Sequence, residues 1–299
     1  MATGLLLLDA YSLIYRAFYA IRSLTGPDGQ PVNAIYGFTK MVRKMMADHQ
    51  PIYCGAVFDL GAPQKRLDLL PSYKIHRPPT PPDLDRQLPA IREVLTAMRI
   101  PIVEQEGEEA DDLIATLGVQ AAGAGQDVLI ASNDKDFMQI VGPRICLLRP
   151  DGKETVICDA SGVQARYGIR PDQVIDYLSL LGDSVDNVPG VPGVGEKTAT
   201  QLIQEYGTLE NLLAHTAEIA KPKLREALET AADRIRANRL LITLHTNLPL
   251  PVTFDALKVS PGDTAALASL FRRFGFKSLL AEVEKAAAPA TDSDLFGSK

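Results

Sequence analysis

The stretch DVLIASNDKD, residues 127–136, decides the fold, because an apolar run ends there in two carboxylates, Asp134 and Asp136. The run DVLIAS (127–132) is short and apolar, which predicts a buried strand. In open parallel sheets, ligands bind just outside the carboxyl ends of the strands. The two acids are therefore predicted to lie at a ligand-binding edge.

Other apolar runs predict strands of the same sheet, and segments with helical spacing separate them. LLLL ends directly before Asp9, and YCGAVF ends directly before Asp59. Strands that alternate with helices are typical of an α/β fold with a mainly parallel sheet flanked by helices. The predicted strands are 5–8, 53–58, 127–132 and a hairpin of 144–149 with 154–158, and the predicted helices are 33–48, 83–98 and 108–122.

From about residue 160 the pattern becomes almost entirely helical, with LPLPVTF (248–254) as a possible strand. The predicted helices of this part are 171–181, 195–205, 208–214, 223–245, 263–274 and 277–285. We therefore divide the chain into three parts: an α/β core (1–180, with a Pro-rich segment at about 70–95), a helical region (181–285) and a flexible tail or start of a linker (286–299).

The composition excludes several classes of protein. The first residues lack a basic n-region, so they do not form a signal peptide, and no apolar stretch is long enough for a membrane helix. Cys54, Cys146 and Cys158 are odd in number and have no CxxC spacing, which favours reduced thiols over disulfides or a zinc site. The four histidines are scattered, so soft or borderline metals lack ligands.

Nine carboxylates follow predicted strands, open the helix in EGEEADDLIA (106–115) or lie in GDSVDN (182–187). They are Asp9, Asp59, Glu109, Asp111, Asp112, Asp134, Asp136, Asp183 and Asp186. Helix capping accounts for any single one, but not for acids at the ends of three strands. Carboxylates in one cleft repel each other unless cations neutralise them or their pKa values rise. All-oxygen ligands select hard ions, so we predict two Mg²⁺ ions, with Mn²⁺ as a substitute.

The same acids explain the net charge. A formal net charge of −6 argues against a nucleic-acid-binding protein, which is usually basic. Without the nine carboxylates, the rest of the chain would carry +3. The remaining surface can therefore still present a basic path.

The stretch PGVPGVGEKTA (189–199) predicts a tight, Gly-rich turn before a helix. Glycines let backbone amides approach a phosphate, and the helix N-terminus supplies a favourable dipole. The Walker spacing of a P-loop is absent. The turn is similar to a helix-hairpin-helix element, which grips the DNA backbone without reading bases. Its proposed DNA-binding residues are Gly190, Gly193, Gly195, Lys197 and Thr198.

The segment YKIHRPPTPPDLDRQ (73–87) is predicted to form an exposed, semi-rigid loop. Its four prolines within five positions cannot lie inside a helix or a sheet. Long loops of this kind are often functional. Tyr73 offers a stacking surface, and Lys74, Arg77 and Arg86 add positive charge, so the segment suits a single DNA strand.

Several long motifs, in the same order, resemble the 5′ nuclease domain of bacterial DNA polymerase I, within the flap endonuclease superfamily. The likeness runs from Leu5 to about Glu284. The motifs are LLLDAYSLIYRAF, AVFD, SYKIHRPPTPPDL, EGEEADDLIA, SNDKDF, LLGDSVDNVPGVPGVGEKTA and, weakly, RRFGFKSLL.

The resemblance implies a PIN-like nuclease core, a helical arch above the active site and a helix-three-turn-helix DNA clamp that often holds K⁺. It implies a metal-dependent 5′-3′ exonuclease and structure-specific 5′ flap endonuclease of DNA replication and repair. Lys74, Arg77 and Arg16 match its basic residues at the arch base and cleft. The residues that match its first metal site are Asp9, Asp59, Glu109, Asp111 and Asp112, and those that match its second are Asp134, Asp136, Asp183 and Asp186.

Three alternatives remain: an RNA-directed PIN-like nuclease, a non-catalytic nucleic-acid-binding protein and a metal-dependent phosphatase, which would leave the Gly-rich turn unexplained. The first usually lacks the Gly-rich turn and the helical half, and the second would be expected to have lost metal ligands. We expect a monomer in the bacterial cytoplasm, associated with the nucleoid, that acts on 5′-flap, nicked or branched DNA. The sequence leaves open whether the chain is a stand-alone nuclease or is fused to a DNA polymerase.

Overall fold

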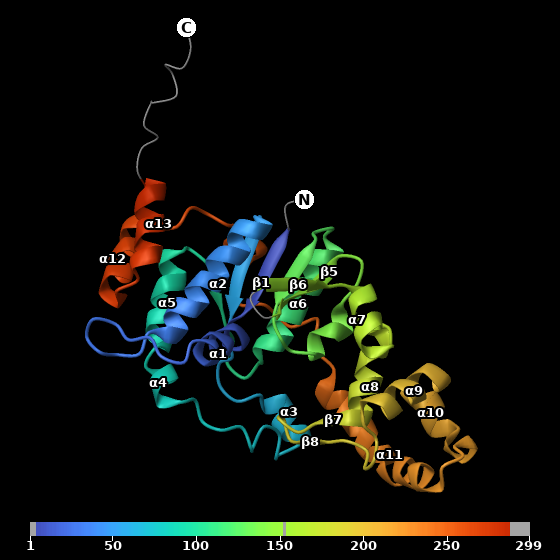
Figure 1. Ribbon diagram of the computed structural model, residues 1–299. Helices are drawn as coiled ribbons and strands as arrows, with labels where there is room; N and C mark the ends of the chain where they lie inside the picture. The colour runs from blue at the N-terminus through green and yellow to red at the C-terminus, as the bar shows by residue number, and fades with distance from the viewer. Residues whose placement is uncertain (1–3, 152–153, 288–299) are drawn as a thin grey trace.

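The computed structural model describes residues 4–151 and 154–287. Nearly all of the tail expected over 286–299, and part of the turn of the expected hairpin, lie outside these residues. A six-stranded sheet forms the centre of the molecule, and helices cover both of its faces (Figure 1).

The strand order in this sheet is β3-β2-β1-β4-β5-β6, and every neighbouring pair is parallel except β5 with β6. The predicted α/β fold and mainly parallel sheet are therefore confirmed. The short strand β3 was not predicted, because two residues are too few to show a pattern. The strands are β1 (Leu5–Asp9), β2 (Tyr53–Val57), β3 (Ile102–Val103), β4 (Val128–Ala131), β5 (Ile145–Asp151) and β6 (Glu154–Cys158).

Successive side chains of β1 point to opposite faces of the sheet, so its four buried leucines enter two different cores. Leu6 and Leu8 pack with α1, α2 and α5, and Leu5 and Leu7 pack with α6. A strand buried on both faces reads as a continuous apolar run, which is the pattern of LLLL. The helices of this half are α1 (Ala10–Ala20), α2 (Asn33–His49), α3 (Gln64–Leu69), α4 (Pro82–Asp85), α5 (Leu88–Ala97), α6 (Ala110–Gly123) and α7 (Ala160–Tyr167).

The rest of the described chain is helical apart from one small ribbon, as predicted. The expected strand in LPLPVTF is wrong: a 3-10 turn, η4 (Phe254–Leu257), follows this stretch, and two prolines there lack the N–H groups that a sheet needs. The last two helices return to the first half of the chain and pack beside α5 (Figure 1). The helices are α8 (Val174–Leu181), α9 (Glu196–Tyr206), α10 (Leu209–Ala214), α11 (Pro222–Ile242), α12 (Thr264–Phe274) and α13 (Lys277–Ala287), with 3-10 turns η1 (Asp136–Ile140), η2 (Pro171–Gln173) and η3 (Thr216–Glu218).

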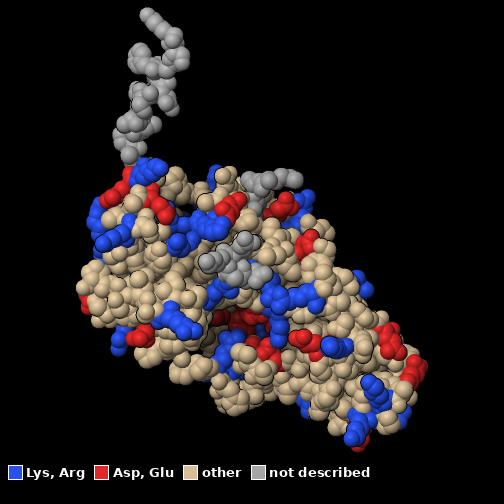
Figure 2. All heavy atoms as spheres, viewed as in Figure 1, with Lys and Arg blue, Asp and Glu red and all other residues tan. Residues whose placement is uncertain are grey.

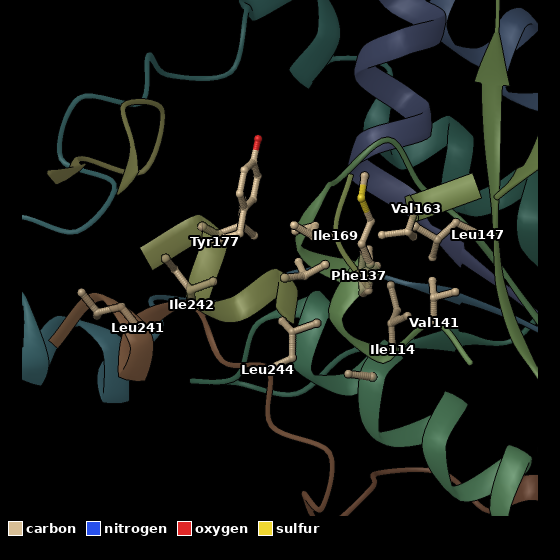
Figure 3. Close-up of a cluster of buried hydrophobic side chains, with 14 of the residues drawn as sticks. Ile114, Phe137, Val141, Leu147, Val163, Ile169, Tyr177, Leu241, Ile242 and Leu244 are labelled. Carbon is tan, nitrogen blue, oxygen red and sulfur yellow. The ribbon is translucent and has the colours of Figure 1, made fainter. Parts of the chain in front are cut away.

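One apolar cluster joins the two halves (Figure 3). Ile114 of α6 and Phe137 of η1 contribute side chains from the first half, and Ile242 of α11 contributes one from the second. Because η1 begins at Asp136, the second acid of the DKD motif, this packing positions the backbone of that motif. The division of the chain near residue 180 stays a prediction.

The segment that was expected to form a helical arch is not helical between residues 71 and 81. It consists of turns at 71–76 and irregular chain up to α4, because Pro78, Pro79 and Pro81 exclude regular structure. Pro82 occupies the first turn of α4, where its missing N–H group costs nothing. The helix expected over 83–98 is accordingly split into α4 and α5.

A two-stranded ribbon, β7 (Gly182–Asp183) with β8 (Val188–Pro189), carries the loop of GDSVDN. The backbones approach closely here. A Cβ atom on Gly190 would lie 2.0 Å from the carbonyl oxygen of Leu181, and one on Gly182 would lie 2.3 Å from that of Val188. Gly182 also has a φ of +69°, which other residues rarely adopt. These two glycines therefore serve packing.

Gly190→Ala should lower the free energy of unfolding by about 1–3 kcal/mol or more, because the new methyl group meets backbone that cannot move aside. Gly195→Ser is the matched control. Position 195 has open space and is the N-cap of α9, where serine is a preferred residue, so stability should be unchanged or slightly higher. Urea unfolding of both variants measures this, and equal stabilities would contradict the packing role.

Candidate active site

An acidic cleft lies at the carboxyl ends of the parallel strands, and Figure 2 shows it as a hollow with Asp and Glu atoms at its base. Tyr11, Ser12, Tyr15 and Asn133 also line it. Six of the nine predicted carboxylates border the cleft: Asp9, Asp59, Asp111, Asp134, Asp183 and Asp186.

Asp9 is held at the end of β1 by its neighbours. Its carboxylate accepts hydrogen bonds from the Ser12 amide (3.2 Å) and the Ser132 hydroxyl (2.5 Å). The sheet register pairs Leu8 with Ala131, which brings Ser132 alongside Asp9. Burial raises the pKa of Asp9 to about 7 from its ordinary 3.8, against the effect of these hydrogen bonds. The site therefore disfavours a bare charge on Asp9.

The neighbouring acids show the same effect. Burial and the nearby carboxylate of Asp134 raise the pKa of Asp111 well above its ordinary value. The pKa of Asp136 is raised for the same two reasons, and burial also raises that of Asp134. The Asp136 amide donates to Asp134 (2.9 Å), which holds the two side by side.

These carboxylates fit divalent metal ions. Their donor atoms are all oxygens, and burial with mutual repulsion is the situation that a bound cation reverses. A hydrogen bond fixes the position of one of these carboxylates: Asp59 accepts from the backbone amide of Ala110, the first residue of α6 (2.8 Å). The residues that could hold metal in the cleft are the six named above, with Asp136 next to them.

The Asp183–Asp186 loop is neutralised by cations from two directions. Lys135 lies 3.0 Å from Asp183, and Arg77 lies 2.6 Å from Asp186. Burial opposes ionisation of Asp183, but the hydrogen bond and charge of Lys135 outweigh it, so the pKa of Asp183 lies below its ordinary value. The Lys74 amide also donates to the Asp186 carbonyl oxygen (2.9 Å), so this loop is joined to the turns at residues 71–76, which we call the arch base.

Lys74 forms an ion pair with Glu109, which is buried beside the cleft. Burial lowers the pKa of Lys74, but the charges of Glu109 and Asp186 raise it by more. The net pKa lies above its ordinary value, so the side chain stays charged. Its backbone has a φ of +57°, in the left-handed region, which is a strained conformation for lysine. Lys74 also lines the cleft, as predicted for a group that meets a phosphate.

The stacking role predicted for Tyr73 is wrong in this structure, because only 8% of its surface is exposed. Its hydroxyl donates to Asp186 (3.2 Å) and approaches Glu109 (3.4 Å), and the ammonium group of Lys74 lies over its ring. Burial raises the pKa of this hydroxyl. Tyr73 therefore packs inward, where it contacts Glu109, Asp186 and Lys74, and it presents no free face to a nucleotide base.

Asp112 lies outside the cleft lining, and Arg66 holds both of its oxygens, at 2.5 and 3.0 Å. Arg66 also pairs with Glu109 (2.5 Å) and donates to the carbonyl oxygen of Leu241 in α11 (3.0 Å). Two acids predicted as ligands of the first metal are thus engaged by one buried guanidinium. Asp112 therefore serves the structure first, and a direct metal contact stays a prediction.

Folding brings a histidine to the acidic helix start, although the sequence showed no metal-binding spacing around the histidines. Glu108, Asp112 and His245 have possible ligand atoms within 4.8 Å of one another. Lys65 pairs with Glu108 (2.5 Å), and Arg66 pairs with Asp112, so this group is already neutralised by cations.

Two predicted basic residues do not line the acidic cleft. Arg16 is half-buried on α1. Arg86 is exposed, lies 3.6 Å from Asp83 and borders a separate hollow with Tyr19 and Arg22. Their proposed roles at the cleft and on DNA stay predictions.

The Gly-rich turn leaves backbone amides uncovered by side chains just before α9. Gly195 is the N-cap of this helix, and no side chain caps the free amides that follow. A Cβ atom on Gly193 or Gly195 would meet open space, so both leave room for a ligand. Lys197 is exposed, and Thr198 is half-buried in the first turn. The arrangement suits a phosphate, and DNA contact at these residues stays a prediction.

Two cleft cations, Lys135 and Arg149, were not predicted from the sequence, nor was Ser132, which donates to Asp9. Ser132 and Lys135 lie inside the DVLIASNDKD stretch, and their position beside the acids could have identified them. Arg149 directly follows the apolar residues of β5, just as Asp9 follows those of β1. This position at the carboxyl end of the apolar run could have identified it. Arg66 gave no signal, because its partners are far away in the sequence.

An α/β sheet with crowded carboxylates at its strand ends, followed by a helical region, is the arrangement that the sequence predicted. Two family models match the chain: "5′-3′ exonuclease, N-terminal resolvase-like domain" over residues 4–168, and "5′-3′ exonuclease, C-terminal SAM fold" over residues 169–265. The chain belongs to the 5′-3′ exonuclease family.

Individual relatives agree with this assignment. The chain is 36% identical to a 5′-3′ exonuclease of Aquifex aeolicus, over 98% of this chain and 99% of that protein. It is also 36% identical to DNA polymerase I of Bacillus caldotenax, over 98% of this chain but 33% of that protein. The chain thus spans about a third of the length of the DNA polymerase I relatives that it matches.

A solved structure shares the fold. The bacteriophage T5 flap endonuclease, in a pseudo-enzyme–product complex with DNA and metal ions, matches with a TM-score of 0.67. The match is 18% identical in sequence and covers 94% of this chain and 98% of that one. Within the described residues, we find no helix whose length and apolar character would let it span a membrane.

Saturating Mg²⁺ should raise the melting temperature relative to EDTA, on the order of 5–10 °C at about pH 8 and less at about pH 5. Metal-free Asp9 keeps its proton up to about pH 7, whereas the unfolded chain loses it near 3.8. Rising pH therefore lowers the stability of the metal-free fold between these values and creates the ionised ligands that Mg²⁺ binds.

Thermal melts over this pH range, with Mg²⁺ and with EDTA, measure the effect. Asp9→Asn is the matched variant, because it should shrink the Mg²⁺ effect at high pH. A Mg²⁺ shift that is the same at both ends of the range would contradict the metal site.

Proposed function

We propose that this chain is a divalent-metal-dependent 5′-3′ exonuclease and 5′ flap endonuclease that hydrolyses DNA phosphodiesters with two metal ions. The observation that supports it most is the cleft itself, where six carboxylates from different elements converge beside paired cations. The family and the T5 flap endonuclease, whose structure holds DNA and metal ions, agree with this activity.

Asp9, Asp59 and Asp111 would hold one ion, and Asp134 with Asp183 and Asp186 would hold or approach the other. Mg²⁺ is the ion we propose, with Mn²⁺ as a substitute, because every donor is a hard oxygen. Bound divalent ions activate water and neutralise the charge of a phosphodiester undergoing displacement.

The protein's own cations complete the site. Lys74 and Arg77 line the cleft, and each is paired with an acid there, Glu109 and Asp186. When metal neutralises the acids, the two cations can turn to the phosphate and stabilise its negative charge. Lys135, paired with Asp183, borders the cleft from the η1 side.

The Pro-rich segment supports a preference for single-stranded 5′ ends. Prolines keep residues 77–81 in irregular chain, and the turn before them is fixed to the Asp186 loop. Exposed Ile75 and Arg77 give this edge an apolar and a charged contact for an unpaired strand.

Duplex DNA would be held at a second place. The free amides before α9, with Lys197 and Thr198, suit a duplex phosphate, and the turn is where the resemblance implies K⁺. A DNA polymerase, on the same or a separate chain, is the partner that fits the relatives.

Asp134→Asn should reduce cleavage of a 5′-flap DNA by orders of magnitude while leaving its binding largely intact, because the change removes charge but little volume. The wild-type protein should cut the flap with Mg²⁺, fail in EDTA, and cut a closed circular duplex far more slowly. Single-turnover cleavage and fluorescence binding measure these quantities. Undiminished cleavage in EDTA or by the variant would sink the proposal.

Lys74→Ala should lower the single-turnover rate by about 10²–10³, and raise the dissociation constant for flap DNA much less, because Lys74 acts on charge that develops in the transition state. Lys65→Ala is the matched control: Lys65 is half-exposed, pairs with Glu108 and lies outside the cleft lining. A Lys74 variant impaired only in affinity, or a control equally slow, would defeat this role.

A further inference from the structure

The cations of the cleft differ in one respect. Four Lys and Arg side chains line it in the described part of the chain: Lys74, Arg77, Lys135 and Arg149. The first three each form an ion pair with a carboxylate of the site. Arg149 has no ion pair or hydrogen bond with the described residues, and its Nη1 atom is buried without an acceptor. Among the described residues, its guanidinium is therefore the cleft cation that is not held by a carboxylate in an ion pair.

Arg149 has a distinct position in the cleft. It belongs to β5, which lies beyond β4 in the sheet, whereas Lys74 and Arg77 come from the arch base. The cleft lining also includes Tyr167, at the end of α7. Tyr167 lines a second hollow as well, together with Arg166 and Lys197, so the two hollows adjoin.

A path of polar groups, with three cations and one acid, Glu196, thus leads from the cleft to the Gly-rich turn. It begins at Arg149, passes Tyr167 and Arg166 and reaches Lys197 in the first turn of α9. Figure 2 shows Lys and Arg atoms beside the acidic hollow on the side of α7. A nucleic-acid backbone that occupies both the cleft and the turn would have to cross this path.

We propose that Arg149 binds one backbone phosphate of the DNA between the metal cleft and the Gly-rich turn. The inference rests on the proposed function, since it assumes DNA in both places. A guanidinium is planar, stays charged and donates in a fork that matches a phosphate, so its unused N–H groups suit this ligand. Burial of an unpaired donor is costly, and a bound phosphate would recover that cost.

The same facts argue against a mainly structural role. Substitution of Arg149 breaks no hydrogen bond or ion pair within the described residues. Arg149→Gln should therefore fold with a melting temperature close to that of the wild type. Arg144→Gln is the matched control. Arg144 directly precedes β5, the strand that carries Arg149, but it pairs with exposed Asp127 at 2.8 Å.

The test uses 5′-flap DNA in which one duplex phosphate at a time is replaced by a neutral methylphosphonate. Arg149→Gln should weaken binding of unmodified DNA by about 10-fold or more, and it should reduce the salt slope of binding by about 1. At one phosphate, the methylphosphonate should weaken the wild type and leave Arg149→Gln unaffected. Arg149→Lys should retain the salt slope, and Arg144→Gln should behave as the wild type.

Cleavage by the wild type in Mg²⁺ is measured in the same series and reports on the proposed function separately. If the wild type cuts flap DNA but Arg149→Gln binds as tightly as the wild type, the phosphate contact is wrong. It is also wrong if every methylphosphonate affects both proteins equally. Should Arg149→Gln melt at a lower temperature, a reduced salt slope in the well-folded Arg149→Lys variant would overturn the proposal as well.

Discussion

Mutual repulsion among carboxylates is the constraint on which this structure depends. Six of them face one cleft, and burial makes the charges of Asp9, Asp111 and Asp134 more costly than in water. Two effects reduce this repulsion. Some acids hold their protons to higher pH, as Asp9 does with a pKa raised to about 7, and Lys and Arg side chains pair with others. Arg66 is the most deeply engaged of these cations, because it joins α3, the start of α6 and the end of α11 through two acids and a backbone carbonyl.

The same constraint connects structure to activity. Each of three cleft cations forms an ion pair with an acid, and under the proposed function metal binding to the acids would free these cations for a phosphate. The left-handed backbone of Lys74 and of Asn187 lies where the arch base meets the Asp186 loop, and Asn187 donates to the carbonyl oxygen of Ser72 (2.9 Å). Strain of this kind persists only where neighbouring contacts hold it, and it clusters at functional sites.

Sequence patterns predicted the parts of the fold that local chemistry decides. Apolar runs gave the main strands, and the acids after them gave the cleft, because parallel strands end at one edge. Long-range contacts were not predictable in this way. Arg66 meets Asp112 across 46 residues, and the burial of Tyr73 depends on Glu109 and on a loop 113 residues away. A Pro-rich segment looks exposed from its composition, although its first residue packs inward.

The most direct test of this account is the location of Mn²⁺ by anomalous scattering in crystals of the protein grown with the ion. Two peaks in the cleft are expected, one among Asp9, Asp59 and Asp111 and one near Asp134, Asp183 and Asp186. The absence of any peak in the cleft would contradict the account. So would binding confined to the group of Glu108, Asp112 and His245, because the cleft carboxylates would then lack the ion on which the proposed chemistry depends.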